Sequence, residues 1–226
     1  MTTKAFAVLA MLAVLLAVGH AHARSEEAIK RNNFGADLLK QGRLDEAIAE
    51  FQRAVEVDPS YATAQFNLGY AYERRDRIDD AIAQYKKALQ LEPGNVLGHN
   101  NLGVLYSKKG LYDEAIATYE QALRIDPANA TVQGNLANAR KDKATIQERE
   151  ARIADAKKQA EARPKDPRAA YNLARVYAAL DMKEQAFEWL SKALQLGFDD
   201  IGFLRDDPAL AGLKNDPRLA RLLEGR

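Results

Sequence analysis

The sequence contains no cysteine and only three histidines in 226 residues. Disulfides, thiol nucleophiles and cysteine-based zinc sites are therefore excluded, because each needs a cysteine sulfur. Two of the histidines, His20 and His22, lie near the N-terminus, which leaves His99 alone in the rest of the chain. A metal site built from several histidines is excluded as well, and we expect His99 to be a packing residue.

The sequence also lacks the patterns of a catalytic or nucleotide-binding protein. It has no glycine-rich phosphate loop, and its acidic pairs lie at expected helix starts, where a carboxylate suits the helix dipole. We therefore expect no enzyme activity, no cofactor and no metal. The 33 basic residues are balanced by 32 acidic ones, without the net basic charge typical of nucleic-acid binders.

The N-terminus carries the one long apolar run. Lys4 is followed by apolar residues from Ala5 to Val18 and then by Ala21-His22-Ala23. This order is typical of a secretory signal peptide, and the run is shorter than the roughly 20 residues that a membrane span needs. We predict a signal peptide over residues 1–23, cleaved after Ala23 rather than kept as an anchor. The mature chain would then be an exported bacterial protein, periplasmic or secreted, with no stable membrane insertion.

Residues 62–95 and 96–129 carry the same 34-residue pattern. The tripeptide Asn-Leu-Gly at 67–69 returns at 101–103, and Tyr72, Ala81 and Pro93 also return 34 positions later. A fixed period of this size indicates a repeat architecture. The pattern extends back over 28–61 and, less regularly, forward over 130–166 and 167–200. We therefore divide residues 28–200 into five units.

Each unit predicts two helices, because apolar residues recur at helical spacing in two groups separated by a short turn. The turns are marked by residues suited to the left-handed backbone conformation: Gly42, Asp76, Gly110 and Asp181. The starts of later units carry side chains that can cap a helix: Asn95, Asn129 and Asp166. Small residues recur where the two helices of a unit should approach closely: Gly35, Gly69 and Gly103 in the first helices, and Ala47, Ala81 and Ala115 in the second.

This series of leucine-glycine, aromatic, alanine and proline at fixed offsets resembles the tetratricopeptide repeat (TPR). The resemblance covers about residues 28–200. It implies an all-α fold, a right-handed superhelix of about five antiparallel helix pairs whose first helices line a concave groove. For function it implies binding of a protein or peptide.

Residues 130–166 depart from the pattern. Arg140 stands where an aromatic residue is expected, and no glycine or aspartate turn follows before Pro164. We expect one long helix or two nearly continuous ones. This segment is either a solvated helix that packs loosely, or its basic face (Lys157, Lys158 and Arg163) docks an acidic partner or lipid headgroups.

Residues 201–226 read as a C-terminal cap. Asp207-Pro208 and Asp216-Pro217 are typical helix starts, with aspartate as the cap and proline in the first turn. They predict two short helices whose leucines cover the last apolar seam, as the terminal repeat of such an array requires.

Asparagine recurs at the sixth place of every unit, although it is a mediocre helix former: Asn33, Asn67, Asn101, Asn135 and Asn172. In the TPR fold this place faces the groove, and the series resembles the asparagine ladder of O-linked N-acetylglucosamine transferases, of which only the repeat part is similar. An amide donates and accepts hydrogen bonds, so the ladder can pair with a peptide backbone of any sequence. The alternative is that these amides bond across to neighbouring helices.

The rest of the predicted peptide-binding surface lies beside this ladder. Apolar contacts come from Phe66, Tyr70 and Val104, and a basic rail recurs at the thirteenth place: Lys40, Arg74 and Lys108. The alternative for the rail is that these charges are solvated and close helix ends. The carboxylate clamp of chaperone-binding TPR proteins is absent, because only Asn67 matches it.

The sequence thus predicts a non-catalytic scaffold that binds an extended peptide segment and no nucleic acid. The alternative is a structural subunit of an envelope or secretion assembly that stacks through convex or terminal surfaces. Homo-oligomerisation is left open in either case.

Overall fold

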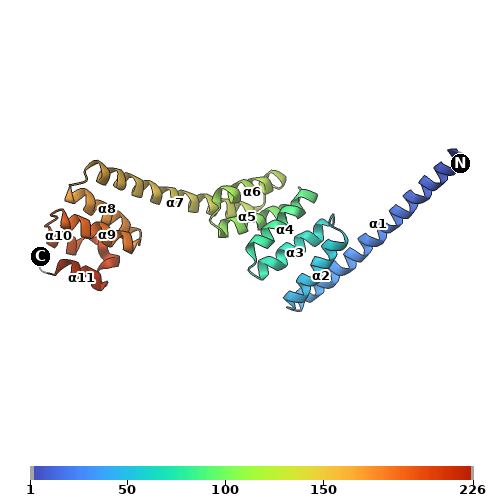
Figure 1. Ribbon diagram of the computed structural model, residues 1–226, viewed down its shortest axis with the longest axis horizontal. Coiled ribbons are helices and arrows are strands. Elements are labelled where there is room, and N and C mark those ends of the chain that lie inside the picture. The colour runs from blue at the N-terminus through green and yellow to red at the C-terminus, as the bar shows by residue number, and fades with distance from the viewer. Residues whose placement is uncertain (1–2, 225–226) are drawn as a thin grey trace. The chain divides into compact units, whose positions relative to one another are not determined.

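A computed structural model describes the backbone of residues 3–224 and the side chains of residues 22–224. Every regular element in this part of the chain is a helix (Figure 1), so the all-α fold class is confirmed. The chain divides into two compact parts, which we call unit 1 (Met1–Lys141) and unit 2 (Asp142–Arg226). They are distinct from the 34-residue repeat units of the sequence. Each has its own apolar core.

Unit 1 is built from three helix pairs and the start of a long helix. Each first helix packs against the helix that follows it, and α1 also contacts α3. The elements are α1 (Thr3–Lys40), α2 (Leu44–Val57), α3 (Ala62–Arg74), α4 (Ile78–Leu91), α5 (Val96–Lys108), α6 (Tyr112–Ile125) and α7 (Ala130–Ala162), which ends in unit 2.

The expected turn and cap residues act as predicted. Gly42 and Gly110 have φ angles of 77° and 73°, and Asp76 adopts the same left-handed region at 60°. Asn95 caps α5, since its Oδ1 accepts a 2.8 Å hydrogen bond from the backbone nitrogen of Gly98. Asn129 caps α7 in the same way. Local signals in the sequence therefore set where these helices begin and end.

The first helix of each pair lies against an aromatic ring from the second. The rings of Phe51, Tyr85 and Tyr119 are at most 2% exposed. A Cβ placed on the facing glycine would lie 2.8 Å from Phe51 at Gly35, 3.0 Å from Tyr85 at Gly69 and 2.5 Å from Tyr119 at Gly103. Only glycine lets the rings pack this close to the first-helix backbone, so the predicted role of the three glycines is confirmed.

Unit 2 contains one further pair and a cap. The pair is α8 (Pro167–Ala179) and α9 (Lys183–Gln195), and the cap consists of α10 (Ile201–Asp206), the 3₁₀ helix η1 (Pro208–Leu213) and α11 (Pro217–Leu223). Asp207 and Asp216 accept hydrogen bonds from the backbone nitrogens of Ala209 and Arg218, so both predicted cap helices start where expected. The sequence prediction missed α10, which begins after Asp200, the residue that caps it.

Residues 130–162 form one helix rather than a pair, so the described chain has four pairs and not five. The physical reason is the missing turn, because no glycine or aspartate in left-handed conformation interrupts α7. Val132 and Leu136, near its start, are buried in the core of unit 1. Ala156 and Ala160, near its end, are buried in the core of unit 2.

The predicted signal peptide lies almost wholly outside the described side chains, which begin at His22. Its cleavage and the export of the protein stay predictions. Among the residues that the structure describes, no helix combines the length and the apolarity needed to cross a membrane.

Two glycines in helices test the close approach of helix and ring. Gly103→Ala should destabilise the protein by about 1–2 kcal/mol, because the clash with buried Tyr119 outweighs the gain in helix propensity. Gly134 in α7 has no atom within 4 Å of an added Cβ. Gly134→Ala should therefore stabilise the protein by about 0.5–1 kcal/mol. Urea denaturation followed by circular dichroism measures both, and equal shifts in one direction would contradict the close approach.

Candidate functional site

The first-helix asparagines of unit 1 are tied to one another across neighbouring helices. Asn67 Nδ2 on α3 donates to Asn32 Oδ1 on α1 at 2.8 Å, and Asn135 Nδ2 on α7 donates to Asn100 Oδ1 on α5, also at 2.8 Å. Asn32 is only 4% exposed, so its bond to Asn67 is largely shielded from water. Each bond fixes the position of one first helix against the next.

Asn101 uses a different partner. Its Nδ2 donates to the Tyr85 hydroxyl at 3.2 Å, and that hydroxyl donates to Glu73 Oε2 at 2.9 Å. Burial raises the pKa of Tyr85 and the neighbouring Glu73 raises it further, so the hydroxyl keeps its proton at neutral pH. Asn101 lacks an asparagine partner because the repeat before it has Phe66 at its fifth place. The other two repeats have Asn32 and Asn100 at that place.

Asn101 Oδ1 also accepts from Asn100 Nδ2 at 3.4 Å. Together these bonds still leave part of each amide unused. Asn67, Asn101 and Asn135 are partly exposed, and an asparagine offers two donor hydrogens and an accepting oxygen. Bonding across to neighbouring helices, the alternative considered for the ladder, is what the structure shows for Asn67 and Asn135. Their contact with a peptide backbone remains a prediction. Asn33 is exposed on α1, and Asn172 lies in unit 2.

The predicted apolar contacts lie beside these amides. Phe66, Tyr70 and Val104 are partly exposed and pack on the core of unit 1. The Phe66 ring meets Tyr85 at a centroid distance of 5.3 Å. Leu97, at the second place of its unit, is 57% exposed. We call the surface formed by Phe66, Asn67, Tyr70, Asn101 and Val104, together with Leu97, the first-helix face.

The three residues of the predicted basic rail are not equivalent. Lys40 Nζ pairs with Asp37 at 3.0 Å. Arg74 Nη1 donates to the Tyr70 hydroxyl at 3.2 Å, and its guanidinium lies 5.9 Å from the centre of that ring. Lys108 is exposed at the end of α5. Lys40 and Arg74 thus each contact a residue of their own helix, which argues against a continuous basic rail.

Sequence reasoning missed four residues that hold this surface in place: Asn32, Asn100, Tyr85 and Glu73. A signal for two of them was present, because Asn-Asn occurs at 32–33 and 100–101. His99, which we expected to be a packing residue, is partly exposed, and its Nε2 lies 2.9 Å from the Pro93 carbonyl oxygen.

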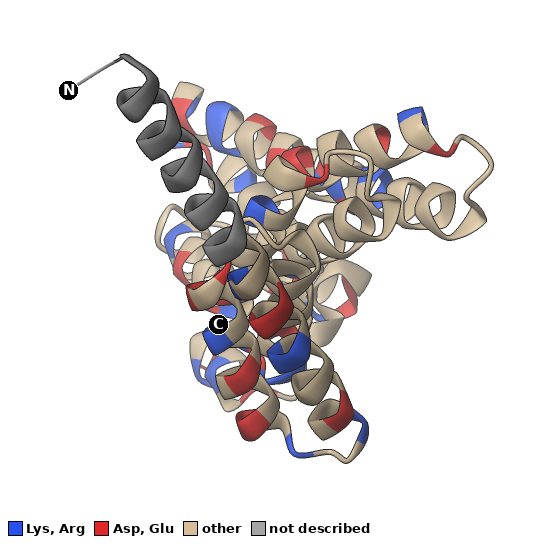
Figure 2. Cartoon of the chain, turned by 90° about the vertical axis from the view of Figure 1, so that its right-hand side faces the viewer, with Lys and Arg blue, Asp and Glu red and all other residues tan. Residues whose placement is uncertain are grey.

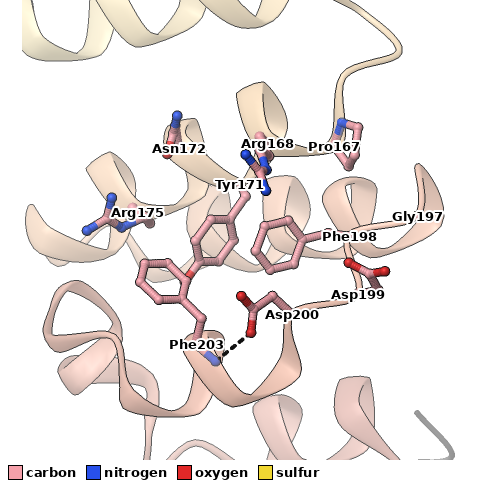
Figure 3. A pocket seen from close by; sticks show the side chains of 10 residues that line it. All are labelled: Pro167, Arg168, Tyr171, Asn172, Arg175, Gly197, Phe198, Asp199, Asp200 and Phe203. Carbon is pink, nitrogen blue, oxygen red and sulfur yellow. Dashed lines mark hydrogen bonds between the residues drawn. The ribbon is translucent and has the colours of Figure 1, made fainter.

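Unit 2 has a pocket beside Asn172, shown in Figure 3, with a volume of about 340 Å³. Tyr171 stacks on Phe198 at a centroid distance of 4.2 Å, and Phe203 meets Tyr171 edge-on at 6.0 Å. Arg168, Asn172 and Arg175 line the pocket from α8. The sequence prediction included only Asn172 of this set.

Buried Asp207 organises the base of this pocket. Its Oδ2 accepts a 2.8 Å hydrogen bond from the Tyr171 hydroxyl and lies 2.5 Å from Arg175 Nε. Burial alone would raise the pKa of Asp207, but the hydrogen bonds from the Ala209 backbone, Tyr171 and Arg175 together lower it. The charged carboxylate therefore holds Arg175 in one position.

No other charged cluster in the described residues suggests a chemical site. Among them, no group of three or more histidine or acidic side chains could hold a metal ion. Acidic and basic residues are interspersed along the coloured helices in Figure 2. The basic residues Lys157, Lys158 and Arg163 of the second half of α7 and its end are exposed, and Arg163 lies 3.5 Å from Asp166.

Asn67→Ala should be about 1 kcal/mol less stable than Asn33→Ala. Both variants gain the same helix propensity, but only the first loses a hydrogen bond, that to Asn32. Thermal or urea unfolding measures the difference. In a double-mutant cycle with Asn32→Ala, a coupling below about 0.3 kcal/mol would contradict a structural role for this bond.

Asp207→Asn should cost about 1.5–3 kcal/mol at neutral pH, the range for hydrogen bonds to a charged group. Because the pKa of Asp207 is lower in the folded protein, its stabilisation is present above the unfolded pKa of about 3.9 and is lost as pH falls through the folded value. The gap between wild type and variant should therefore narrow below about pH 4.

Fluorescence of Trp189, the single tryptophan, follows this unfolding because the residue packs on the core of unit 2. Asp206→Asn, which changes an exposed neighbour, is the matched control. A gap between wild type and Asp207→Asn that is the same at pH 3 and pH 7 would refute the role of the carboxylate.

Comparison with known proteins agrees with this geometry. Tetratricopeptide repeat models match residues 32–96, 96–129 and 167–198, more than half of the chain together. The tetratricopeptide repeat domain-containing protein PYG7, chloroplastic, of Arabidopsis thaliana is 44% identical over 43 residues, which cover 19% of this chain and 14% of that protein.

Two solved structures are similar over larger parts. The first TPR of Spaghetti (RPAP3), bound to the HSP90 peptide SRMEEVD, is 24% identical with a TM-score of 0.52 and covers 53% of this chain and 95% of its own. YrrB, described as a TPR protein with an unusual peptide-binding site, is 25% identical with a TM-score of 0.50, covering 79% and 91%. With its helix pairs, its glycine-to-ring packing and these matches, the chain belongs to the tetratricopeptide repeat family.

Proposed function

We propose that the protein is a non-catalytic interaction scaffold that binds an extended segment of a protein partner on the first-helix face. The observation that carries the proposal is the arrangement of half-used amides beside exposed apolar side chains. Asn67 and Asn101 are held by Asn32 and Tyr85, yet both remain partly exposed.

Amides fixed in this way suit a peptide backbone. An extended peptide presents alternating N–H and C=O groups, and each asparagine can donate to one and accept from the other. Because internal hydrogen bonds already restrict these side chains, binding costs less conformational entropy than it would for free ones. The amides would therefore contribute affinity without selecting a peptide sequence.

Selectivity would come from the apolar side chains of the same face. Phe66 directly precedes Asn67 on α3, Tyr70 lies three residues after Asn67, nearly one helical turn, and Val104 and Leu97 lie on α5. Aromatic side chains that are partly buried and held by a partner, as Tyr70 is by Arg74, are typical anchors of interfaces. The peptide-binding site named for YrrB supports the same function.

In this proposal the scaffold is exported from the cytoplasm of a bacterium, because the N-terminal apolar run and the Ala-His-Ala tripeptide after it are typical of a signal peptide. The intact mass of the protein purified from an envelope fraction would test this export. A mature N-terminus at Arg24 supports export, and an intact Met1 in that fraction contradicts cleavage.

One observation favours the alternative of an assembly subunit. Phe34 is 54% exposed on α1, whereas the residues at the same place in later units, Leu68, Leu102 and Leu136, are at most 7% exposed. Those leucines belong to the buried core of unit 1, whereas Phe34 neither belongs to this core nor packs against it. Stacking through this terminal surface would bury it.

Peptides selected from a displayed library of random sequences, with the purified chain as bait, test the first proposal. Tyr70→Ala should weaken a selected peptide at least about tenfold, as for an interface anchor. Tyr112→Ala is the matched control, because Tyr112 also packs partly buried on the unit 1 core but from a second helix. Equal affinity for wild type and Tyr70→Ala would refute binding on this face.

Sedimentation of wild type and Phe34→Ala separates the alternative from this proposal. A wild-type oligomer that dissociates in the variant, together with selected peptides that ignore Tyr70→Ala, supports the assembly subunit. A monomer whose peptide affinity depends on Tyr70 supports the scaffold.

A further inference from the structure

We propose that the pocket of unit 2 is a second binding site, which takes one aromatic side chain of a protein partner. The site goes beyond the first-helix face, because its lining residues all lie between Pro167 and Phe203 in unit 2. They come from α8, from the connection after α9 and from α10. Its binding therefore does not depend on whether the first-helix face binds a peptide.

The floor of the pocket is a series of aromatic rings with an open end. Phe198 and Tyr171 are stacked and buried, at 7% and 2% exposure, and Phe203 continues the series edge-on to Tyr171. Phe203 itself is 49% exposed. Aromatic rings attract one another at centroid distances of about 4.5–7 Å, so the open side of Phe203 can accept a further ring.

Helix α8 supplies two guanidinium groups and an amide to the lining of the pocket. Arg168, Asn172 and Arg175 are spaced by four and three residues on one side of α8, and Figure 3 shows them along this helix. Arg175 is held by Asp207, and its guanidinium lies 5.9 Å from the centre of the Phe203 ring. Arginine over the face of an aromatic ring is attracted by the π electrons.

Arg168 is available for the same contact. Its side chain is exposed, and within the described part of the chain its guanidinium makes no hydrogen bond or ion pair. Asn172 is likewise exposed. A ring that enters the pocket would thus have both Phe203 and a guanidinium among the groups that line it.

The charges around the pocket favour a neutral side chain. Asp199 and Asp200 lie across the pocket from α8 (Figure 3), and Asp200 Oδ1 accepts a 3.0 Å hydrogen bond from the Phe203 backbone nitrogen. Asp207 neutralises the charge of Arg175, which leaves Arg168 facing the two carboxylates of Asp199 and Asp200. A partner side chain with a charge of either sign would therefore be repelled by a like charge in the pocket lining. The volume of about 340 Å³ lies at the lower end of ligand pockets, roughly 300–1,000 Å³, and suits a single side chain.

Nuclear magnetic resonance of the ¹⁵N-labelled full chain tests the proposal with N-acetyl-phenylalanine amide as the probe. Saturable shifts should appear at the amides of residues 197–203, with a dissociation constant on the order of 1 mM for a ligand of this size. N-acetyl-cyclohexylalanine amide keeps the apolar shape but lacks the π system. It should bind about two- to fivefold more weakly, because it gains nothing from the guanidinium groups.

Variants locate the probe. Phe203→Ala should abolish the saturable shifts, and Arg168→Gln should weaken binding about two- to fivefold. Phe34→Ala, which removes a phenylalanine of similar exposure from unit 1, and Arg205→Gln, which removes an exposed arginine of α10 outside the pocket, are the matched controls. Both should bind the probe as wild type does.

Three results would overturn the proposal. They are an absence of saturable shifts at residues 197–203 up to the solubility of the probe, equal affinity for both probes, and unchanged binding by Arg168→Gln. The Trp189 indole signal shows whether Phe203→Ala is folded, and the Arg168→Gln result stands on its own if it is not. If the selected peptides lose affinity for Tyr70→Ala, the function proposed for the first-helix face stands, whether or not the pocket binds the probe.

Discussion

The packing of a buried aromatic ring against a glycine of the preceding helix is the contact on which unit 1 depends. It occurs three times at the same places of the repeat, between Gly35 and Phe51, Gly69 and Tyr85, and Gly103 and Tyr119. Each glycine faces a ring of the second helix, so the opposite side of the first helix is not covered by that partner. That uncovered side carries the asparagines.

The same ring also organises the polar network at the centre of unit 1. Tyr85 packs on Gly69, contacts the tilted ring of Phe66, and forms hydrogen bonds with both Glu73 and Asn101 through its hydroxyl. Core packing and the candidate binding surface are therefore coupled through one side chain. Substitutions at Tyr85 would alter both, which is why side chains at the surface, such as Tyr70, separate binding from folding more cleanly.

Helix α7 shows what happens when this contact is missing. Ala137 stands at the place of the glycines but is exposed, and no aromatic residue follows where Tyr85 and Tyr119 stand in their units. Without a ring to hold a second helix and without a turn residue, the helix continues. Its two ends are then buried in different cores, Leu136 in that of unit 1 and Ala160 in that of unit 2.

The sequence by itself determined the helix pairs, their turns and their caps, because these depend on local backbone preferences of residues such as Gly42, Asp76 and Asn95. It also determined the TPR fold, since glycine and aromatic residues recur at a fixed period. Only the tertiary structure decided how the asparagine amides are used, because Asn67 meets Asn32 across 35 positions of sequence and Asn101 turns to Tyr85. The pocket around Phe203 was likewise decided there, because Tyr171, Arg175 and Asp207 come together only when the cap folds back onto α8.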